Sequence, residues 1–171
     1  QRLVISTQAR QLIPYIADAV PGWFQPVLVL YDTDGKAVAY DDDYRFKPDP
    51  TILCEIPRDS EYVLGIYDSI YRGREDFVYR ITVGELPYVT GIFPLGGPAG
   101  GETTVALKGW NLPVTSVTQT NGEPGVYPLA VERDGRFSNP VPYAVDALPD
   151  SVEQEPKIMT DAPSSFARCL W

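Results

Sequence analysis

The sequence predicts an all-β protein made of two antiparallel β-sandwich units joined end to end. Three observations support this prediction. Apolar runs of strand length alternate with turn residues along the whole chain. The 171 residues include 17 prolines and 14 glycines, which suit many short strands and would disrupt a helical bundle. No stretch has the length and period of a substantial helix.

The first unit is expected over residues 1–84. The turn Asp32-Thr33-Asp34-Gly35 places a glycine where a hairpin needs a positive φ, and Pro57 begins a second turn. Residues 12–25 are predicted to form a short ordered connection, because Pro14 and Pro21 limit any helix there, with Trp23 and Phe24 covering the core. The predicted strands are residues 3–7, 27–31, 37–40, 51–56, 62–67 and 77–83.

The second unit is expected over residues 87–147, after a break at residues 84–87. The glycine-rich run 96–101 is interpreted as a tight turn between strands, since it lacks the Gly-Lys-Ser/Thr ending of a phosphate loop. Further turns are predicted at Asn121-Gly122 and Asp134-Gly135. Residues 148–171 are polar and contain proline, which suits a linker or tail. The predicted strands are residues 88–93, 103–108, 114–119, 125–131 and 141–145.

Composition excludes several classes of function. The net charge of −9 argues against nucleic acid as a partner, because phosphate binding needs clustered lysine and arginine. The chain has no histidine, which removes Ser-His-Asp and Cys-His nucleophiles and most zinc sites. No spacing selects a carboxylate pair for glycoside hydrolysis. We therefore expect no enzymatic activity from the chain itself.

Two further features concern compartment and cysteine chemistry. No apolar run approaches the length of a membrane span, and we expect no signal peptide within these residues. Cys54 and Cys169 cannot form a disulfide framework, and Cys54 alternates with Ile52 and Ile56, so a buried free thiol is favoured over a bridge. The chain opens at Gln1 directly into a predicted strand, which is typical of a piece of a larger protein.

The run Asp41, Asp42 and Asp43 is the one candidate metal site. Calcium takes several carboxylate and carbonyl oxygens, so an acidic loop on a β-scaffold can supply ligands. Three adjacent like charges must be offset by a cation, by water or by nearby arginines. We favour the last, with Arg72 and Arg74 as the neutralising groups, and expect no obligatory cofactor.

A candidate interaction surface comprises Tyr44, Arg45, Tyr71, Arg72 and Arg74. Exposed tyrosine and arginine are enriched at the centres of protein interfaces. The alternative is that the arginines neutralise the aspartates and the aromatic rings pack on the sheet. The sequence leaves both interpretations open.

The first unit resembles the bacterial pre-peptidase C-terminal domain. The resemblance is carried by Leu30-Tyr31-Asp32-x-Asp34-Gly35, the Asp41–Asp43 run, Glu61-Tyr62-Val63-Leu64 and Tyr79-Arg80-Ile81. It implies a secreted jelly-roll sandwich related to the collagen-binding modules of bacterial collagenases, with its first strands lying before Gln1. The blocks PYIADAVPGWFQ, YDDDYRF and IYRGREDFVYRITVGELPYVTGIFPLGG are similar to the version found in large, uncharacterised bacterial envelope proteins.

The second unit resembles the immunoglobulin-like domain shared by plexins and transcription factors. The motif is Ile92-x-Pro94-x-x-Gly97-x-x-Gly100-Gly101 followed by Val105-x-Leu107-x-Gly109-x-x-Leu112. The basic loops of the DNA-binding members are missing. The resemblances imply an extracellular, periplasmic or cell-envelope location, with other domains of a larger parent protein and an extracellular protein or glycan as partners. We expect a non-catalytic binding or spacer module; the alternative is an accessory fragment of a secreted hydrolase.

Overall fold

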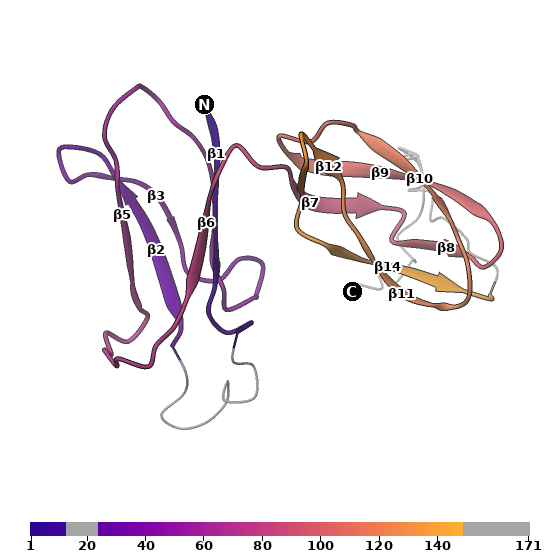
Figure 1. Ribbon diagram of the computed structural model, residues 1–171, viewed down its shortest axis with the longest axis horizontal. Helices are drawn as coiled ribbons and strands as arrows, with labels where there is room; N and C mark the ends of the chain where they lie inside the picture. The colour runs from indigo at the N-terminus through magenta and orange to yellow at the C-terminus, as the bar shows by residue number, and fades with distance from the viewer. Residues whose placement is uncertain (13–23, 149–171) are drawn as a thin grey trace, which may run out of the picture.

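The computed structural model describes residues 1–12 and 24–148 and is all-β over these ranges. Two three-stranded antiparallel sheets form the first unit, in the strand orders β4-β1-β6 and β3-β2-β5 (Figure 1). Its first strand in sequence is therefore the central strand of its sheet. The strands are β1 (Arg2–Gln8), β2 (Pro26–Tyr31), β3 (Ala37–Asp41), β4 (Thr51–Glu55), β5 (Val63–Asp68) and β6 (Arg80–Gly84).

The second unit contains two further three-stranded sheets and a short hairpin. The sheet orders are β10-β9-β7 and β11-β14-β8, and β12 pairs with β13 across the turn at Asp134-Gly135. No sheet of the described residues combines strands from both sides of residues 85–87. The strands are β7 (Tyr88–Phe93), β8 (Gly96–Pro98), β9 (Glu102–Trp110), β10 (Ser116–Thr120), β11 (Gly125–Leu129), β12 (Glu132–Arg133), β13 (Arg136–Phe137) and β14 (Val141–Asp146).

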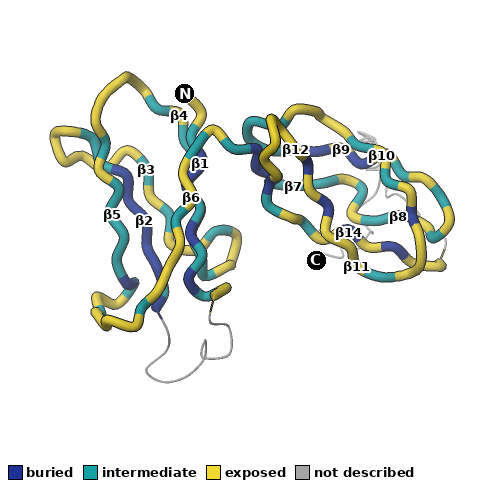
Figure 2. The backbone as a smooth tube through the Cα atoms, viewed as in Figure 1, coloured by how far each residue is buried: buried dark blue, intermediate teal, exposed yellow. Residues whose placement is uncertain are grey.

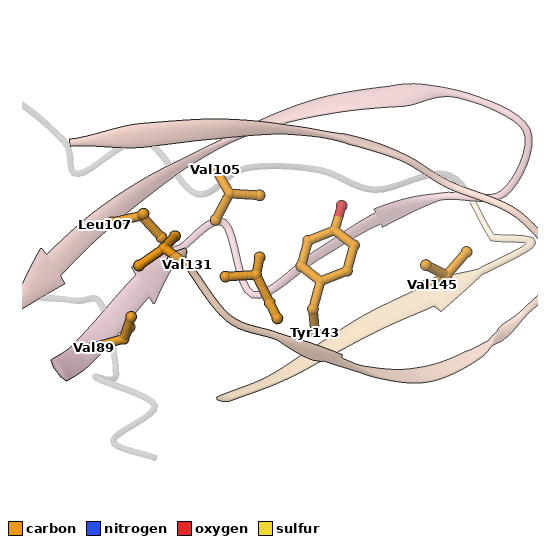
Figure 3. Packing of buried hydrophobic residues seen from close by; sticks show 7 residues of the cluster. Val89, Val105, Leu107, Val131, Tyr143 and Val145 are labelled. Atoms are coloured by element: carbon orange, nitrogen blue, oxygen red, sulfur yellow. The ribbon is translucent and has the colours of Figure 1, made fainter. Parts of the chain in front are cut away.

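Each unit has its own hydrophobic core. In the first unit, β1 and β2 carry much of the buried chain shown in Figure 2, and Ile5, Leu28, Leu30 and Ile52 form the central cluster. The ring of Phe24 stacks on Phe77 at 5.3 Å near one end of this unit. The second core gathers side chains from both sheets of its unit (Figure 3). Its members are Val89, Val105, Leu107, Leu129, Val131, Tyr143 and Val145.

Most predicted strands are confirmed, with one correction in the glycine-rich run. Residues 96–98 form strand β8, not part of a turn, and β8 pairs in parallel with β14. This is an exception to the predicted antiparallel pairing. It depends on Gly96 and Gly97, because a Cβ at Gly96 would overlap the backbone of Ala144.

Two other predictions concern the core of the first unit. Cys54 is a half-buried free thiol packed against the core cluster, and burial raises its pKa. Phe24 is buried as predicted. The expected short connection lies mainly in residues 13–23, and most of the expected tail lies in residues 149–171, both outside the described residues.

The two units contact each other directly around the linker. The Tyr88 hydroxyl lies 3.4 Å from the Thr51 hydroxyl, and the ring of Tyr88 meets the edge of Tyr44 at 5.6 Å. Arg2 places its guanidinium 4.3 Å from the centre of the Trp110 ring. Thr51 and Arg2 belong to the sheet β4-β1-β6, and Tyr44 lies in the loop before β4. The strands β1 and β6 lie on the side of the second unit, while β3-β2-β5 lies on the far side (Figure 1).

Candidate functional site

Four tyrosines gather on the outer surface of the sheet β3-β2-β5. Side chains alternate across a strand, and the pairs Val27–Tyr67, Val29–Gly65 and Val29–Tyr40 place these residues on one side. The opposite side carries Leu28 and Leu30 into the core. Tyr40 is 57% exposed and Tyr71, in the loop after β5, is 86% exposed. We call Tyr31, Tyr40, Tyr67 and Tyr71 the tyrosine face.

The rings of the tyrosine face are arranged by local contacts. Tyr67 and Tyr71 stack with their centroids 5.9 Å apart and their planes 5° from parallel. The ring of Tyr31 lies over Gly65, since a Cβ on that glycine would be 3.1 Å from Tyr31 Cε2. Glycine therefore leaves the room that the Tyr31 ring occupies.

Tyr40 is linked to the acidic end of β3. Its hydroxyl donates a hydrogen bond to Asp42 Oδ2 at 2.9 Å. This bond, followed by burial and the charge of Asp42, raises the pKa of Tyr40 to about 12. The phenol therefore stays protonated at neutral pH, and the carboxylate of Asp42 lies at the edge of the ring.

The loop that carries Tyr71 is held by the buried carboxylate of Asp68. Asp68 is 2% exposed and forms a bidentate ion pair with Arg72, at 2.9 Å from Nε and 3.0 Å from Nη2. It also accepts hydrogen bonds from the backbone N–H groups of Gln25, Ile70 and Arg72. Tyr71 itself has a φ of 60°, which is unfavourable for a residue with a side chain. The Asp68 contacts fix this turn and with it the position of the Tyr71 ring.

The same contacts determine the ionisation of Asp68. Burial alone would raise the pKa of this carboxyl group, but Arg72 and the three backbone donors outweigh it and lower the pKa to about 2. Asp68 is therefore charged at every pH above about 3. The Asp68 carboxylate that holds the loop is therefore ionised throughout the neutral pH range.

The predicted acidic run does not converge on one point. Asp41 accepts a hydrogen bond from the Thr51 N–H at 2.6 Å, and Asp43 accepts one from Gln25 Nε2 at 3.2 Å. Burial raises the pKa of Asp41, the Thr51 bond opposes the rise, and Asp42 and Asp43 add to it. Residues 1–12 and 24–148 contain no group of three acidic or cysteine side chains placed to hold a metal ion. Calcium binding at this run stays the untested alternative to neutralisation by arginines.

The arginines predicted to neutralise this run pair with other acids. Arg72 pairs with Asp68, and Arg74 pairs with Asp76 at 2.9 Å from Nε. Both acids lie within four residues of their arginine along the chain, so they are reached at lower entropic cost than the distant β3 loop. Pairing of these arginines with Asp68 and Asp76 is shown, and neutralisation of the run by them stays a prediction.

The predicted interaction surface is divided between two places. Tyr71, Arg72 and Arg74 lie in the loop after β5, at the tyrosine face. Tyr44 and Arg45 instead contact the second unit, where Arg45 donates a hydrogen bond to the carbonyl of Thr90. Sequence reasoning missed Tyr31, Tyr40 and Tyr67, although their period-two spacing with valine and glycine was a usable signal.

Comparisons with protein-family models, curated proteins and solved structures give no match for this chain. The described residues include no helix that could span a membrane.

Proposed function

We propose that this chain is a non-catalytic β-sandwich module that binds a neutral glycan through the tyrosine face. The observation that carries the proposal is the set of four tyrosines beside Asp42 on one side of the sheet β3-β2-β5, where Tyr40 and Tyr71 are exposed and Tyr31 and Tyr67 are partly exposed. As the family resemblances imply, the module would belong to a larger secreted or envelope protein.

Ring chemistry supports a sugar ligand. A pyranose presents a C–H surface that packs on an aromatic ring, and its hydroxyls need hydrogen-bond partners at the ring edge. Tyrosine supplies both an apolar ring and a polar tip, and Asp42 adds an acceptor beside Tyr40. The stacked pair Tyr67–Tyr71 extends this surface from the sheet into the loop.

Charge supports a neutral rather than an acidic glycan. Asp41, Asp42 and Asp43 lie at the end of β3 beside the tyrosine face, and the whole chain has a net charge of −9. An acidic polymer approaching this edge would be repelled. A neutral polysaccharide would lose nothing to repulsion and could donate a hydroxyl to the carboxylate of Asp42, which lies beside Tyr40.

Titration calorimetry with a panel of soluble neutral polysaccharides tests the proposal. Tyr71→Ala should weaken binding at least about fivefold, because one stacked ring contributes on the order of 1 kcal/mol. Tyr40→Ala should have a similar effect. Tyr127→Ala is the matched control, since Tyr127 is an exposed tyrosine of the second unit.

Two outcomes would contradict the proposal. One is the absence of binding to any neutral polysaccharide by the intact chain. The other is an equal loss of affinity in Tyr127→Ala and Tyr71→Ala, which would show that the tyrosine face has no special role.

A further inference from the structure

A second candidate site, independent of the tyrosine face, lies between the two units. A groove of about 640 Å³ separates the outer side of the sheet β4-β1-β6 from residues 137–140 of the second unit. This volume is within the range of small-ligand sites. We call it the junction groove.

The floor of the junction groove is polar. The cross-strand pairs Ser6–Thr51, Ser6–Thr82 and Gln8–Arg80 place hydroxyl, amide and guanidinium groups on the side of the sheet that faces the groove. The Ser6 and Thr51 hydroxyls lie 3.2 Å apart, and the Tyr88 hydroxyl adjoins Thr51. These groups can both donate and accept hydrogen bonds.

The charged groups of the lining are mostly cationic, in a chain whose net charge is −9. Arg10, Lys47 and Arg80 line the groove with one acid, Asp49. Both oxygens of Asp49 accept hydrogen bonds from backbone N–H groups, those of residues 9 and 10 on Oδ1 and that of residue 11 on Oδ2. Within the described ranges neither Lys47 nor Arg80 forms an ion pair. The groove therefore suits an anionic ligand.

Backbone pairing argues against an extended peptide as that ligand. Binding by strand addition needs a free strand edge. The floor of the groove is a face of the sheet and not an edge, and the central strand β1 is already paired with both β4 and β6. A ligand rich in hydroxyls and carboxylates matches the side chains that remain, and Phe137, 69% exposed, offers a ring at the rim.

We propose that the junction groove binds an acidic oligosaccharide, with Arg80 and Lys47 pairing its uronate carboxylates and the floor hydroxyls and Gln8 contacting its hydroxyls. The site differs from the tyrosine face in position and in the charge of its ligand. Each proposal can therefore fail without the other.

Calorimetry of the whole chain with a short oligogalacturonate tests this proposal. Arg80→Gln and Lys47→Gln should each weaken binding roughly tenfold, since a charge-assisted hydrogen bond is lost. Lys108→Gln removes the same charge from an exposed position of β9 and should leave binding unchanged. The methyl-esterified oligosaccharide should not bind. Tyr71→Ala should leave oligogalacturonate binding intact.

Three outcomes would overturn the proposal. The first is no binding of oligogalacturonate at low salt by the unmutated chain, with its melting transition intact. The second is an equal loss in Lys108→Gln, which would indicate attraction by overall charge alone. The third is equally tight binding of a polyglutamate peptide with the same dependence on Arg80, which would make the ligand a peptide.

Discussion

The two units of this chain fix their irregular segments by different chemistry. In the first unit, a buried charged group holds the loop after β5, where Asp68 pairs with Arg72 and with three backbone donors. In the second unit, a network of neutral hydrogen-bonding groups holds the irregular segments. Asn121 donates to the Pro98 carbonyl and to Thr103, and accepts from the Tyr143 hydroxyl at 3.0 Å.

This difference predicts how the stability of each unit responds to added side-chain volume and to acid. A neutral network of amide and hydroxyl groups contains no acid, so it depends mainly on close packing and hydrogen bonds. A buried ion pair requires its carboxylate to stay ionised, so protonation of the carboxylate removes it. The second unit should therefore be sensitive to added volume, and the first to acid.

The largest effect is expected from Gly97→Ala in the second unit. A Cβ at this position would lie 2.8 Å from the Tyr143 hydroxyl and 2.7 Å from Asn121 Nδ2, and closer still to Thr103. The methyl group must displace the network, at a cost of about 3 kcal/mol in unfolding free energy. Hydrogen exchange followed by mass spectrometry should show the loss in peptides from the second unit.

Gly122→Ala provides the control for that measurement. A Cβ added at Gly122 would meet no heavy atom within 4 Å, although this glycine adjoins the network residue Asn121 in the chain. Its unfolding free energy should change by less than about 1 kcal/mol. Equal destabilisation by the two substitutions would show that steric overlap at Gly97 is not the cause.

A smaller, pH-dependent effect is expected from Asp68→Asn in the first unit. The folded pKa of about 2 lies below the unfolded value of about 3.9. The charged form therefore stabilises the fold above about pH 4, and this contribution is lost as the pH falls from about 4 to about 2. At pH 7 the unfolding free energy of Asp68→Asn should be about 2 kcal/mol lower than that of the unmutated chain, because a neutral amide replaces the carboxylate that pairs with Arg72.

Measuring both the unmutated chain and Asp68→Asn as the pH is lowered makes this prediction specific. As the pH falls from 4 to 2, peptides of the first unit in the unmutated chain should lose protection from hydrogen exchange. The difference in stability between the unmutated chain and Asp68→Asn should therefore shrink over this range. A difference that stays constant over this range would contradict the role assigned to the ionised carboxylate.

The smallest effect is expected from calcium. Asp41, Asp42 and Asp43 each contact a different protein group, so millimolar calcium should leave the melting temperature of both units unchanged. A rise in melting temperature that Asp43→Asn abolishes and Arg72→Ala preserves would instead establish a calcium site at this run.

The sequence predicted what depends on local pattern. Strands β1, β2, β3, β4 and β7 appear at or within two residues of their predicted limits, because alternating apolar side chains and turn residues define them locally. Strand β8 could not be predicted, since a Gly-Gly-Pro triplet is typical of a turn. It becomes a strand only through pairing with β14, far along the chain.

The candidate sites were predictable only in part. Tyr71 was identified from an exposed loop, but the rings that join it on the tyrosine face belong to three different strands. Their proximity depends on the strand order β3-β2-β5, which composition does not determine. For the same reason Tyr44 and Arg45 were interpreted as an external contact surface, whereas the fold turns both toward its own second unit.

The side chain of Asn111 has a mechanical consequence. Strands β1 and β6 are antiparallel with Val4 opposite Gly84, so the start of one lies beside the end of the other. A force pulling residues 1 and 87 apart would therefore open their ladder one hydrogen bond at a time from that end. Asn111 of the second unit donates to the carbonyls of both Arg2 and Leu86, at 2.9 and 3.1 Å, and so ties the two ends together. We therefore expect these two hydrogen bonds from the second unit to raise the force needed to begin opening the β1–β6 ladder of the first.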